Sequence, residues 1–120
     1  MPNPVVHWEI GTSDAGKLAG FYKGIFGWHA EEFPGEQPYQ MIDAHNEERG
    51  INGGIAQSDQ SWLTFYVEVD DIDAYLAKIG EQGGRTLVPR TEMGMVTFAQ
   101  FADPEGHVVG LVEPRAQQKS

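Results

Sequence analysis

Asp103-Pro104-Glu105-Gly106-His107-Val108-Val109-Gly110-Leu111-Val112-Glu113 is a turn followed by a short apolar strand near the C-terminus. Proline and glycine are turn residues, and the apolar run after them is typical of a buried strand. Side chains of a strand alternate between its two faces, so if Val109 and Leu111 pack against a helix, Gly110 lies on the opposite face. The residues on that opposite face decide what this strand contributes to a site.

The residues before this stretch predict one β-α-β-β-β unit. Trp62 to Val69 alternates apolar and polar side chains, which is typical of a strand with one buried face. A helix begins at about Asp70, its apolar residues recur at offsets of three and four, and the pair Gly83-Gly84 ends it. We expect the three remaining strands at Arg85 to Pro89, Met95 to Phe101 and His107 to Glu113.

The first half of the chain repeats this order. A strand at Val5 to Ile10 is followed by a helix from about Asp14 to Phe26. Three short strands are predicted at Trp28 to Phe33, Tyr39 to Ala44 and Ile51 to Gln57. A shift of 57 positions aligns His7 with Thr64, and a shift of 56 aligns Gly54 with Gly110. A repeated unit of this size constrains the whole architecture.

The repeat predicts an α+β fold in which two βαβββ modules form a curved mixed sheet with the helices on its outer face. We expect residues 1–120 to be a single domain made of two internal repeats, at about 5–57 and 62–114.

Composition narrows the class of partner. Eight Lys and Arg stand against 18 Asp and Glu, for a net charge of −10, which repels phosphate backbones and anionic membranes. Cysteine is absent, which excludes disulfides, thiolate metal sites and a cysteine nucleophile. No segment has the pattern of a signal peptide or a membrane span. We therefore expect a cytoplasmic protein that binds neither nucleic acid nor membranes.

Strand parity predicts which side chains face a cleft between the two modules. The apolar residues expected on the helix side are Val6, Trp8, Ile10, Ile51, Ile55, Leu63, Phe65, Val67, Val69, Val109 and Leu111. The alternate residues then face the cleft, and they are His7, Glu9, Gly54, Thr64, Tyr66, Glu68 and Gly110. The pattern leaves the orientation of the third strand of each module open, and with it the faces of Met41 and Gln100.

The chain resembles the vicinal oxygen chelate superfamily, which contains glyoxalase I, extradiol dioxygenases, fosfomycin-resistance enzymes and bleomycin-resistance proteins. The resemblance covers nearly the whole chain. The segments that carry it are the strand Val5 to Ile10, Phe21-Tyr22-Lys23-Gly24-Ile25-Phe26-Gly27-Trp28, Val69-Asp70-Asp71-Ile72, the pair Gly83-Gly84 and the turn Asp103-Pro104-Glu105-Gly106.

The resemblance also implies four positions for metal ligands, two in each module. In this chain they are His7, Gly54, Thr64 and Gly110, where metal-dependent members usually carry His or Gln and Glu. Only His7 is a strong candidate ligand, because threonine is a poor substitute and glycine has no side chain. Glu113 lies three residues beyond Gly110 and on the opposite face. We therefore expect no metal and no other cofactor, with His7 as the only surviving candidate ligand.

The cleft residues permit more than one interpretation. His7 is a metal ligand, a catalytic acid or base oriented by Glu9, or a hydrogen-bonded residue that lines a pocket. Glu9 needs solvent or a partner such as Tyr66 or His7. Tyr66 is a structural aromatic or a residue that stacks on a ligand. Gly54 and Gly110 are packing glycines or positions that widen the cleft.

Our leading hypothesis from the sequence is binding or sequestration of a small organic ligand without a metal, by residues His7, Glu9, Gly54, Thr64, Tyr66 and Gly110. The alternative is a lyase, isomerase or dioxygenase that acts on a dicarbonyl, a thiol adduct or an aromatic substrate, with His7 and Glu9 as catalytic residues. A third hypothesis is protection from a cationic glycopeptide drug by an acidic cleft. The resemblance implies a homodimer.

Overall fold

A computed structural model describes residues 2–33, 38–94 and 96–114 of the protein, and all structural statements below concern these residues. They form two compact units, one of residues 6–64 and one of residues 65–114 together with the N-terminal segment 2–5. Met95, the expected first residue of one strand, lies outside the described residues.

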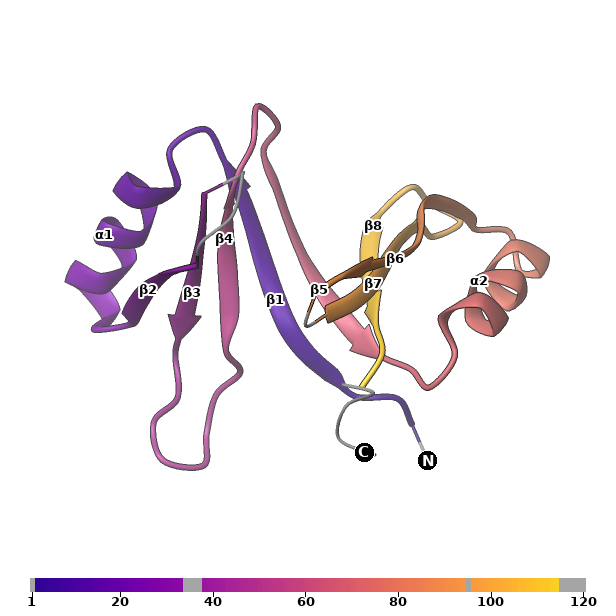
Figure 1. Ribbon diagram of the computed structural model, residues 1–120, viewed down its shortest axis with the longest axis horizontal. Helices are drawn as coiled ribbons and strands as arrows, with labels where there is room; N and C mark the ends of the chain where they lie inside the picture. The colour runs from indigo at the N-terminus through magenta and orange to yellow at the C-terminus, as the bar shows by residue number, and fades with distance from the viewer. Residues whose placement is uncertain (1, 34–37, 95, 115–120) are drawn as a thin grey trace. The chain divides into compact units, whose positions relative to one another are not determined.

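Each module has the predicted β-α-β-β-β order (Figure 1). The first contains β1 (Val5–Thr12), α1 (Ala15–Phe26), β2 (His29–Phe33), β3 (Tyr39–Asp43) and β4 (Gly53–Gln57). The second contains β5 (Trp62–Glu68), α2 (Ile72–Glu81), β6 (Arg85–Met93), β7 (Val96–Ala102) and β8 (Val108–Val112). The prediction of an α+β fold built from two βαβββ modules is confirmed.

The two modules pair their strands in the same way. In the first the strand order is β2-β3-β4-β1, and in the second it is β6-β7-β8-β5. The first strand of each module runs parallel to the last, with Glu9 opposite Gly54 and Tyr66 opposite Gly110. The remaining pairs are antiparallel, so each module is a mixed sheet. The register therefore brings the predicted site residues of each module onto adjacent strands.

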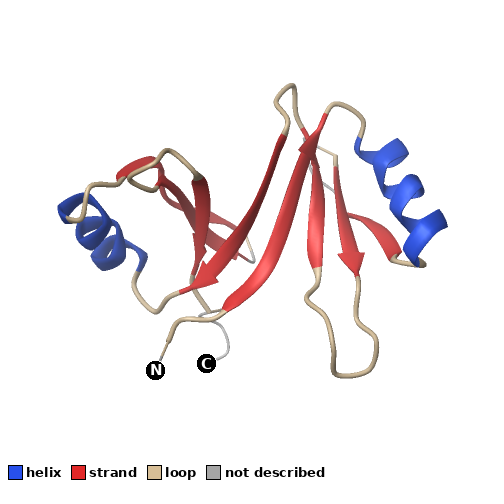
Figure 2. Cartoon of the chain, turned by 180° about the vertical axis from the view of Figure 1, so that it is seen from behind, coloured by secondary structure: helices blue, strands red, loops and turns tan. Residues whose placement is uncertain are grey.

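Helix α1 has clear boundaries. Asp14 is the N-cap, and its carboxylate accepts a hydrogen bond of 3.1 Å from the backbone N–H of Lys17. Gly27 ends the helix in the left-handed region, with φ of 74°, and donates its N–H to the carbonyl of Lys23. The helix packs on one face of the first module (Figure 2), over a core that contains Ala15, Ala19, Ile42, Ile55, Trp8 and Ile10.

Helix α2 packs on the second module in the same manner. Asp71 is its N-cap and accepts from the backbone N–H of Ala74. The core beneath it contains Val69, Ile72, Ala99 and Leu111, with Val67, Tyr75, Leu76, Ile79 and Phe101 packed around them. Ala99 and Phe101 therefore point to the helix, which assigns Gln100 to the opposite face of β7.

Strand parity did not predict how deeply several apolar side chains are buried. Leu63 and Phe65 are 75% and 43% exposed, and neither belongs to the core under α2. Val6 is also exposed, and Ile51 precedes β4 and is exposed. Alternation assigns the face of a side chain but not how far along the strand the helix reaches, and α2 packs on the end of β5 near Val67.

The strand boundaries differ most in β6, which continues to Met93 instead of ending at Pro89. Its pairing with β7 shifts register between Thr86 and Val88 and again between Val88 and Thr91. Proline has no N–H for the ladder, and such irregularities allow a strand to continue past it. The proline therefore marks a bulged part of the strand and not its end.

A polar residue beyond or at the end of the last strand of each module satisfies the first N–H of that module's helix. Gln57 Oε1 accepts from the backbone N–H of Ala15 at 2.9 Å, and Gln57 also donates to the carbonyl of Ser13. Glu113 Oε2 accepts from the backbone N–H of Ile72 at 2.9 Å. These two residues are aligned by the repeat, and neither faces the predicted site.

Glu113 also forms an ion pair with Arg90, with two contacts of 3.2 Å. The hydrogen bonds from Arg90 hold the pKa of the Glu113 carboxyl below its ordinary value, and the bond from Ile72 adds to this effect. A lowered pKa in the folded state means that the ionised carboxylate stabilises the fold above its unfolded pKa. That contribution is lost as the pH falls through the folded pKa.

We expect Glu113→Gln to lower the free energy of unfolding at pH 7 by about 1–2 kcal/mol, because it removes a charged hydrogen-bond acceptor. The difference from the wild type should shrink only as the pH falls through the lowered folded pKa of Glu113, so the second measurement is made at the lowest pH at which the protein remains folded. Urea unfolding at both pH values measures it. Glu92→Gln is the matched control, since Glu92 contacts the same arginine but its side chain is 69% exposed. An equal loss at both pH values would contradict the assignment.

Candidate functional site

The polar face of the first module holds a buried carboxylate with two neutral donors. Glu9 on β1 is only 9% exposed. The Tyr39 hydroxyl from β3 donates to Glu9 Oε2 at 3.0 Å, and the Trp62 indole N–H from β5 donates to Glu9 Oε1 at 3.3 Å. Both donors come from strands other than β1, so the tertiary structure and not the local sequence orients the carboxylate.

His7 joins this group through Tyr39. Its Nε2 lies 3.1 Å from the Tyr39 hydroxyl oxygen. The single hydroxyl proton is directed to Glu9, so the tyrosine oxygen accepts from His7, which assigns the proton of the neutral imidazole to Nε2 and its basic lone pair to Nδ1. Burial lowers the pKa of His7 below its ordinary value, which favours this neutral form at pH 7. We call His7, Glu9, Tyr39 and Trp62 the Glu9 cluster.

Gly54 makes room for the tyrosine of this cluster. A Cβ atom at position 54 would lie 2.1 Å from the Tyr39 hydroxyl oxygen and 2.3 Å from the ring carbon that carries it. The ring of Tyr39 therefore lies against the backbone of Gly54, in the space that a side chain there would fill. This supports packing as the role of the glycine, because the vacated volume is occupied and does not enlarge a cavity.

The second module repeats this relation with a residue from another strand. A Cβ atom at Gly110 would lie 2.3 Å from two ring carbons of Tyr66, its neighbour on β5. Tyr66 is 7% exposed, and Gln100 on β7 donates its side-chain N–H to the Tyr66 hydroxyl at 3.0 Å. Tyr66 is thus a hydrogen-bonded aromatic that occupies the space above a glycine.

Sequence reasoning missed three of these residues. Tyr39 was predicted only as the start of a strand, Trp62 likewise, and Gln100 was left without a face. Once Ile42 is known to lie in the core under α1, parity places Tyr39 on the polar face of β3, so the missing signal was the orientation of that strand. Thr64, which parity predicted to face the cleft, is 6% exposed on β5.

The residues at the family's metal positions do not fit a metal of the family type. In the first module these positions are an imidazole that donates to a tyrosine and a glycine covered by that tyrosine. In the second they are a threonine and a glycine covered by Tyr66. Divalent ions need several strong nitrogen or oxygen donors, and here one is present. Among the described residues, no group of three or more His, Asp or Glu is placed to hold an ion.

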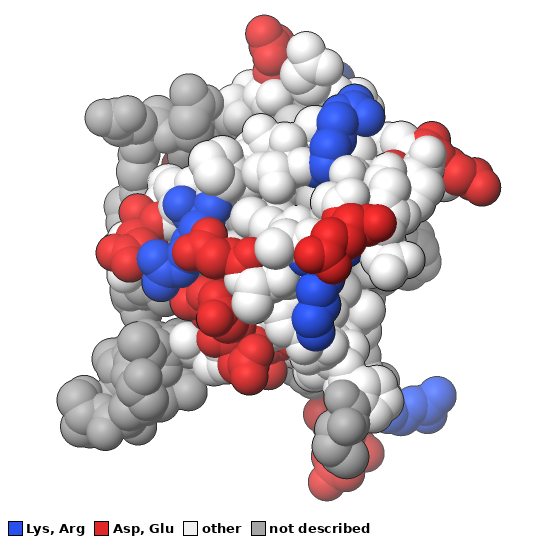
Figure 3. Space-filling model, turned by 90° about the vertical axis from the view of Figure 1, so that its right-hand side faces the viewer, with Lys and Arg blue, Asp and Glu red and all other residues white. Residues whose placement is uncertain are grey.

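The described helices are also too short and too polar to cross a membrane. On the face drawn in Figure 3, acidic and basic side chains are interspersed, with neutral surface between them. This face therefore lacks the continuous basic patch that nucleic-acid binding requires.

The paired βαβββ modules, each with its first and last strands parallel and adjacent, define the glyoxalase-like class of α+β proteins. A model of the Glyoxalase/Bleomycin resistance protein/Dioxygenase superfamily matches residues 5–111, and the chain belongs to that superfamily.

Its curated relatives are distant and mostly longer. "Putative glyoxylase CFP32" of Mycobacterium tuberculosis is 30% identical over 112 residues, which cover 86% of this chain and 42% of the relative. The anthracycline biosynthesis protein DnrV of Streptomyces peucetius is 27% identical, over 88% of this chain and 45% of its own length. The chain thus spans less than half of these two proteins. A glyoxylase-like domain-containing protein of Didymella fabae is 27% identical and is covered to 84%.

Solved structures show the same fold. The methylmalonyl-CoA epimerase of Streptomyces coelicolor in complex with 2-nitronate-propionyl-CoA superposes with a TM-score of 0.73, at 16% identity and 97% coverage of both chains. The methylmalonyl-CoA epimerase of Mycobacterium tuberculosis gives 0.69 at 16% identity, covering 96% of this chain and 90% of the other. At these identities the likeness concerns the fold.

The tyrosines above the two glycines lead to a stability prediction. We expect Gly110→Ala to cost about 2–3 kcal/mol, because the new methyl group overlaps the body of the Tyr66 ring. Gly54→Ala should cost less, since it meets the end of the Tyr39 side chain, which can swing away. Urea unfolding gives both values. In a Tyr66→Ala background the cost of Gly110→Ala should largely disappear; an unchanged cost would show that the ring is not what the methyl group meets.

Proposed function

We propose that this protein binds a small organic ligand at the Glu9 cluster, on the polar face of the first module, without a metal ion of the family type. The observation that carries the proposal is the buried Glu9 carboxylate, which Tyr39 and Trp62 orient. The Tyr39 ring lies on Gly54, the position at which the family resemblance implies a metal-binding glutamate. A carboxylate oriented by neutral donors can accept further hydrogen bonds from a ligand.

The composition of the Glu9 cluster suggests the chemistry of this ligand. Tyr39 and Trp62 supply flat apolar surfaces with polar edges, and Glu9 and His7 supply acceptors. Binding sites for small molecules combine such surfaces with a few oriented polar groups. We therefore propose a flat or branched organic ligand that carries hydroxyl or other N–H and O–H donors. Two relatives are named as a putative glyoxylase and an anthracycline biosynthesis protein, and these names support a small organic molecule as the ligand.

We include in this proposal a homodimer, as the family resemblance suggests, and a cytoplasmic location, which the absence of cysteine supports. Neither is required for the binding chemistry of the Glu9 cluster.

The metal-free part of the proposal has a direct test. Protein purified without chelator should contain metal well below one equivalent, and titration with Ni, Mn, Zn or Fe(II) followed by calorimetry should show no saturable site. The physical reason is the single strong donor, His7, at the family positions. His7→Ala is the matched variant, and any weak metal uptake should be unchanged in it. Stoichiometric metal that His7→Ala abolishes would refute metal independence.

A second candidate function is an isomerase or lyase that moves a proton, favoured by the hydrogen-bonded chain from His7 through Tyr39 to Glu9. A substrate proton taken by Nδ1 of His7 would let Nε2–H pass its proton to Tyr39, which passes its own to Glu9. The electron pair of the broken C–H bond stays on the substrate as an enolate, one proton ends on the Glu9 carboxylate, and the reverse transfer returns a proton to the substrate carbon. This hydrogen-bonded relay from His7 to Glu9 needs no metal ion, so it does not depend on the family's metal positions in either module.

One experiment separates binding from this proton transfer. Methylmalonyl-CoA, the substrate named for two of the structural neighbours, is incubated with the protein in D₂O, and deuterium at the α-carbon is followed by NMR. The binding proposal predicts no exchange above the buffer rate. The isomerase alternative predicts exchange that Glu9→Gln lowers by about 100-fold or more. Glu31→Gln on exposed β2 is the matched control and should leave the rate unchanged.

A binding experiment uses two compounds that the names of the structural neighbours and relatives suggest. Methylmalonyl-CoA and an anthracycline are titrated while the three indole N–H signals are followed by NMR. Saturable shifts of the Trp62 signal, weakened by Tyr39→Phe, would support the Glu9 cluster as the binding site. Saturable binding that leaves the Trp62 signal unmoved would place the ligand elsewhere and overturn the assignment.

A further inference from the structure

A hollow lies away from the Glu9 cluster, at the C-terminal end of α1. It has a volume of about 640 Å³ and is lined by the helix end at Phe26 and Gly27, by Trp28, and by residues 43–47 that follow β3. Tyr39 of the Glu9 cluster is at the other end of β3, so the two sites use opposite ends of this strand. The size is in the range of small-molecule pockets.

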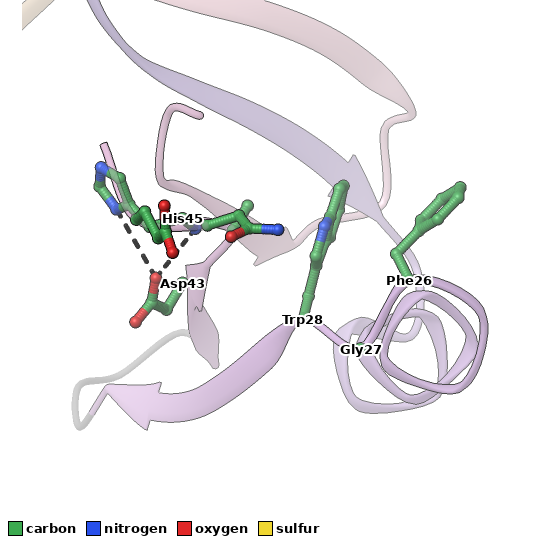
Figure 4. Close-up of a pocket in the computed structure, with 8 residues that line it drawn as sticks. Phe26, Gly27, Trp28, Asp43 and His45 are labelled. Carbon is green, nitrogen blue, oxygen red and sulfur yellow. Dashed lines mark hydrogen bonds and ion pairs between the residues drawn. The ribbon is translucent and has the colours of Figure 1, made fainter. Parts of the chain in front are cut away.

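One wall of the hollow is aromatic and firmly packed. The Trp28 ring stacks on Tyr22 at a centroid distance of 5.2 Å and contacts Trp8 and Phe26 at 5.2 and 5.4 Å. Figure 4 shows the Trp28 ring edge-on, with Phe26 on one side and Asp43 and His45 on the other. A face of the indole is therefore turned toward the carboxylate side of the hollow.

The opposite wall is acidic, and it also contains the imidazole of His45, whose Nδ1 lies 3.6 Å from Asp43 Oδ1. Asp43 and Glu47 both line the hollow, and Asp43 Oδ1 accepts from the backbone N–H of His45 at 3.1 Å. The C-terminal end of α1, at Phe26 and Gly27, adds the negative end of a helix dipole to the same space. An indole face, two carboxylates and a helix C-terminus all favour positive charge.

The acidic wall is held in place by its own backbone. Asn46 and Arg49 close the turn with two backbone hydrogen bonds of 2.9 and 3.1 Å, and Asn52 Oδ1 accepts from the N–H of Ala44 at 2.9 Å. Within this turn Glu47 has φ of 60°, in the left-handed region where glycine or asparagine is normally favoured. A strained glutamate in a closed turn that lines a hollow is a reason to look for a function of its side chain.

We propose that this hollow is a binding site for small organic cations, with the charged nitrogen between the Trp28 ring and the carboxylates of Asp43 and Glu47. A quaternary ammonium group is the best match, because it has no hydrogen-bond donors to satisfy and is attracted by both the ring face and the carboxylates. The net charge of −10 raises the local concentration of such cations further. This site is independent of the Glu9 cluster and of the ligand proposed there.

Choline and its neutral isostere 3,3-dimethylbutan-1-ol test the proposal at low salt. We expect choline to shift the Trp28 indole N–H signal saturably in ¹H–¹⁵N spectra, and the isostere to bind about fivefold or more weakly. Trp28→Phe identifies the signal. Nα-acetyl-lysine amide is the second cationic probe: tighter binding than choline would assign the site to a lysine side chain of a protein, and weaker binding to a small ammonium compound. Equal affinity for choline and the isostere would overturn the proposal.

Glu47→Gln isolates the charge without removing the aromatic wall. It should weaken choline binding about threefold at low salt and much less at high salt, because screening suppresses the same interaction. Glu105→Gln removes an equal charge from an exposed turn in the other module and should leave the affinity unchanged. Equal weakening by both variants would show that only the net charge matters, and it would refute a specific site. Thermal unfolding of each variant checks that the fold is intact.

Discussion

A buried carboxylate must be hydrogen-bonded, and the polar face of the first module is built around this requirement at Glu9. The Tyr39 hydroxyl can reach the carboxylate only because Gly54 has no side chain beneath the ring. That hydroxyl then accepts from His7, so one glycine on β4 determines the contacts of residues on β1 and β3. The Tyr39 ring thereby fills the space that a side chain at position 54 would occupy.

The two modules satisfy the same constraint with different residues. Glu9 and Tyr66 occupy equivalent places, each opposite the glycine of its last strand. In the first module the ring above the glycine comes from β3, whereas in the second it comes from β5 itself and is bonded to Gln100. The repeat is therefore symmetric in backbone and register but not in chemistry. The proposed ligand contacts involve the buried carboxylate opposite Gly54, for which the second module has a tyrosine opposite Gly110.

The polar residues associated with the last strands show how the repeat separates folding from function. Gln57 and Glu113 look like displaced metal ligands in the sequence, yet each accepts from the first N–H of the helix in its module. An unsatisfied helix terminus beside a core is costly, so a side chain that reaches it stabilises the whole module. The metal-binding role and the capping role belong to opposite faces of the strand, and parity alone distinguishes them.

The sequence by itself determined the two βαβββ modules and the approximate limits of their helices, because these follow from local periodicity. Side-chain alternation predicted the faces of His7, Glu9, Gly54, Gly110 and Glu113. Only the tertiary structure decided that Tyr39 and Trp62 donate to Glu9, and that rings cover both glycines. It also decided that Leu63 and Phe65 stay exposed. These features depend on strand pairing and on how far each helix extends over its strands, and both are set by contacts between segments far apart in the chain.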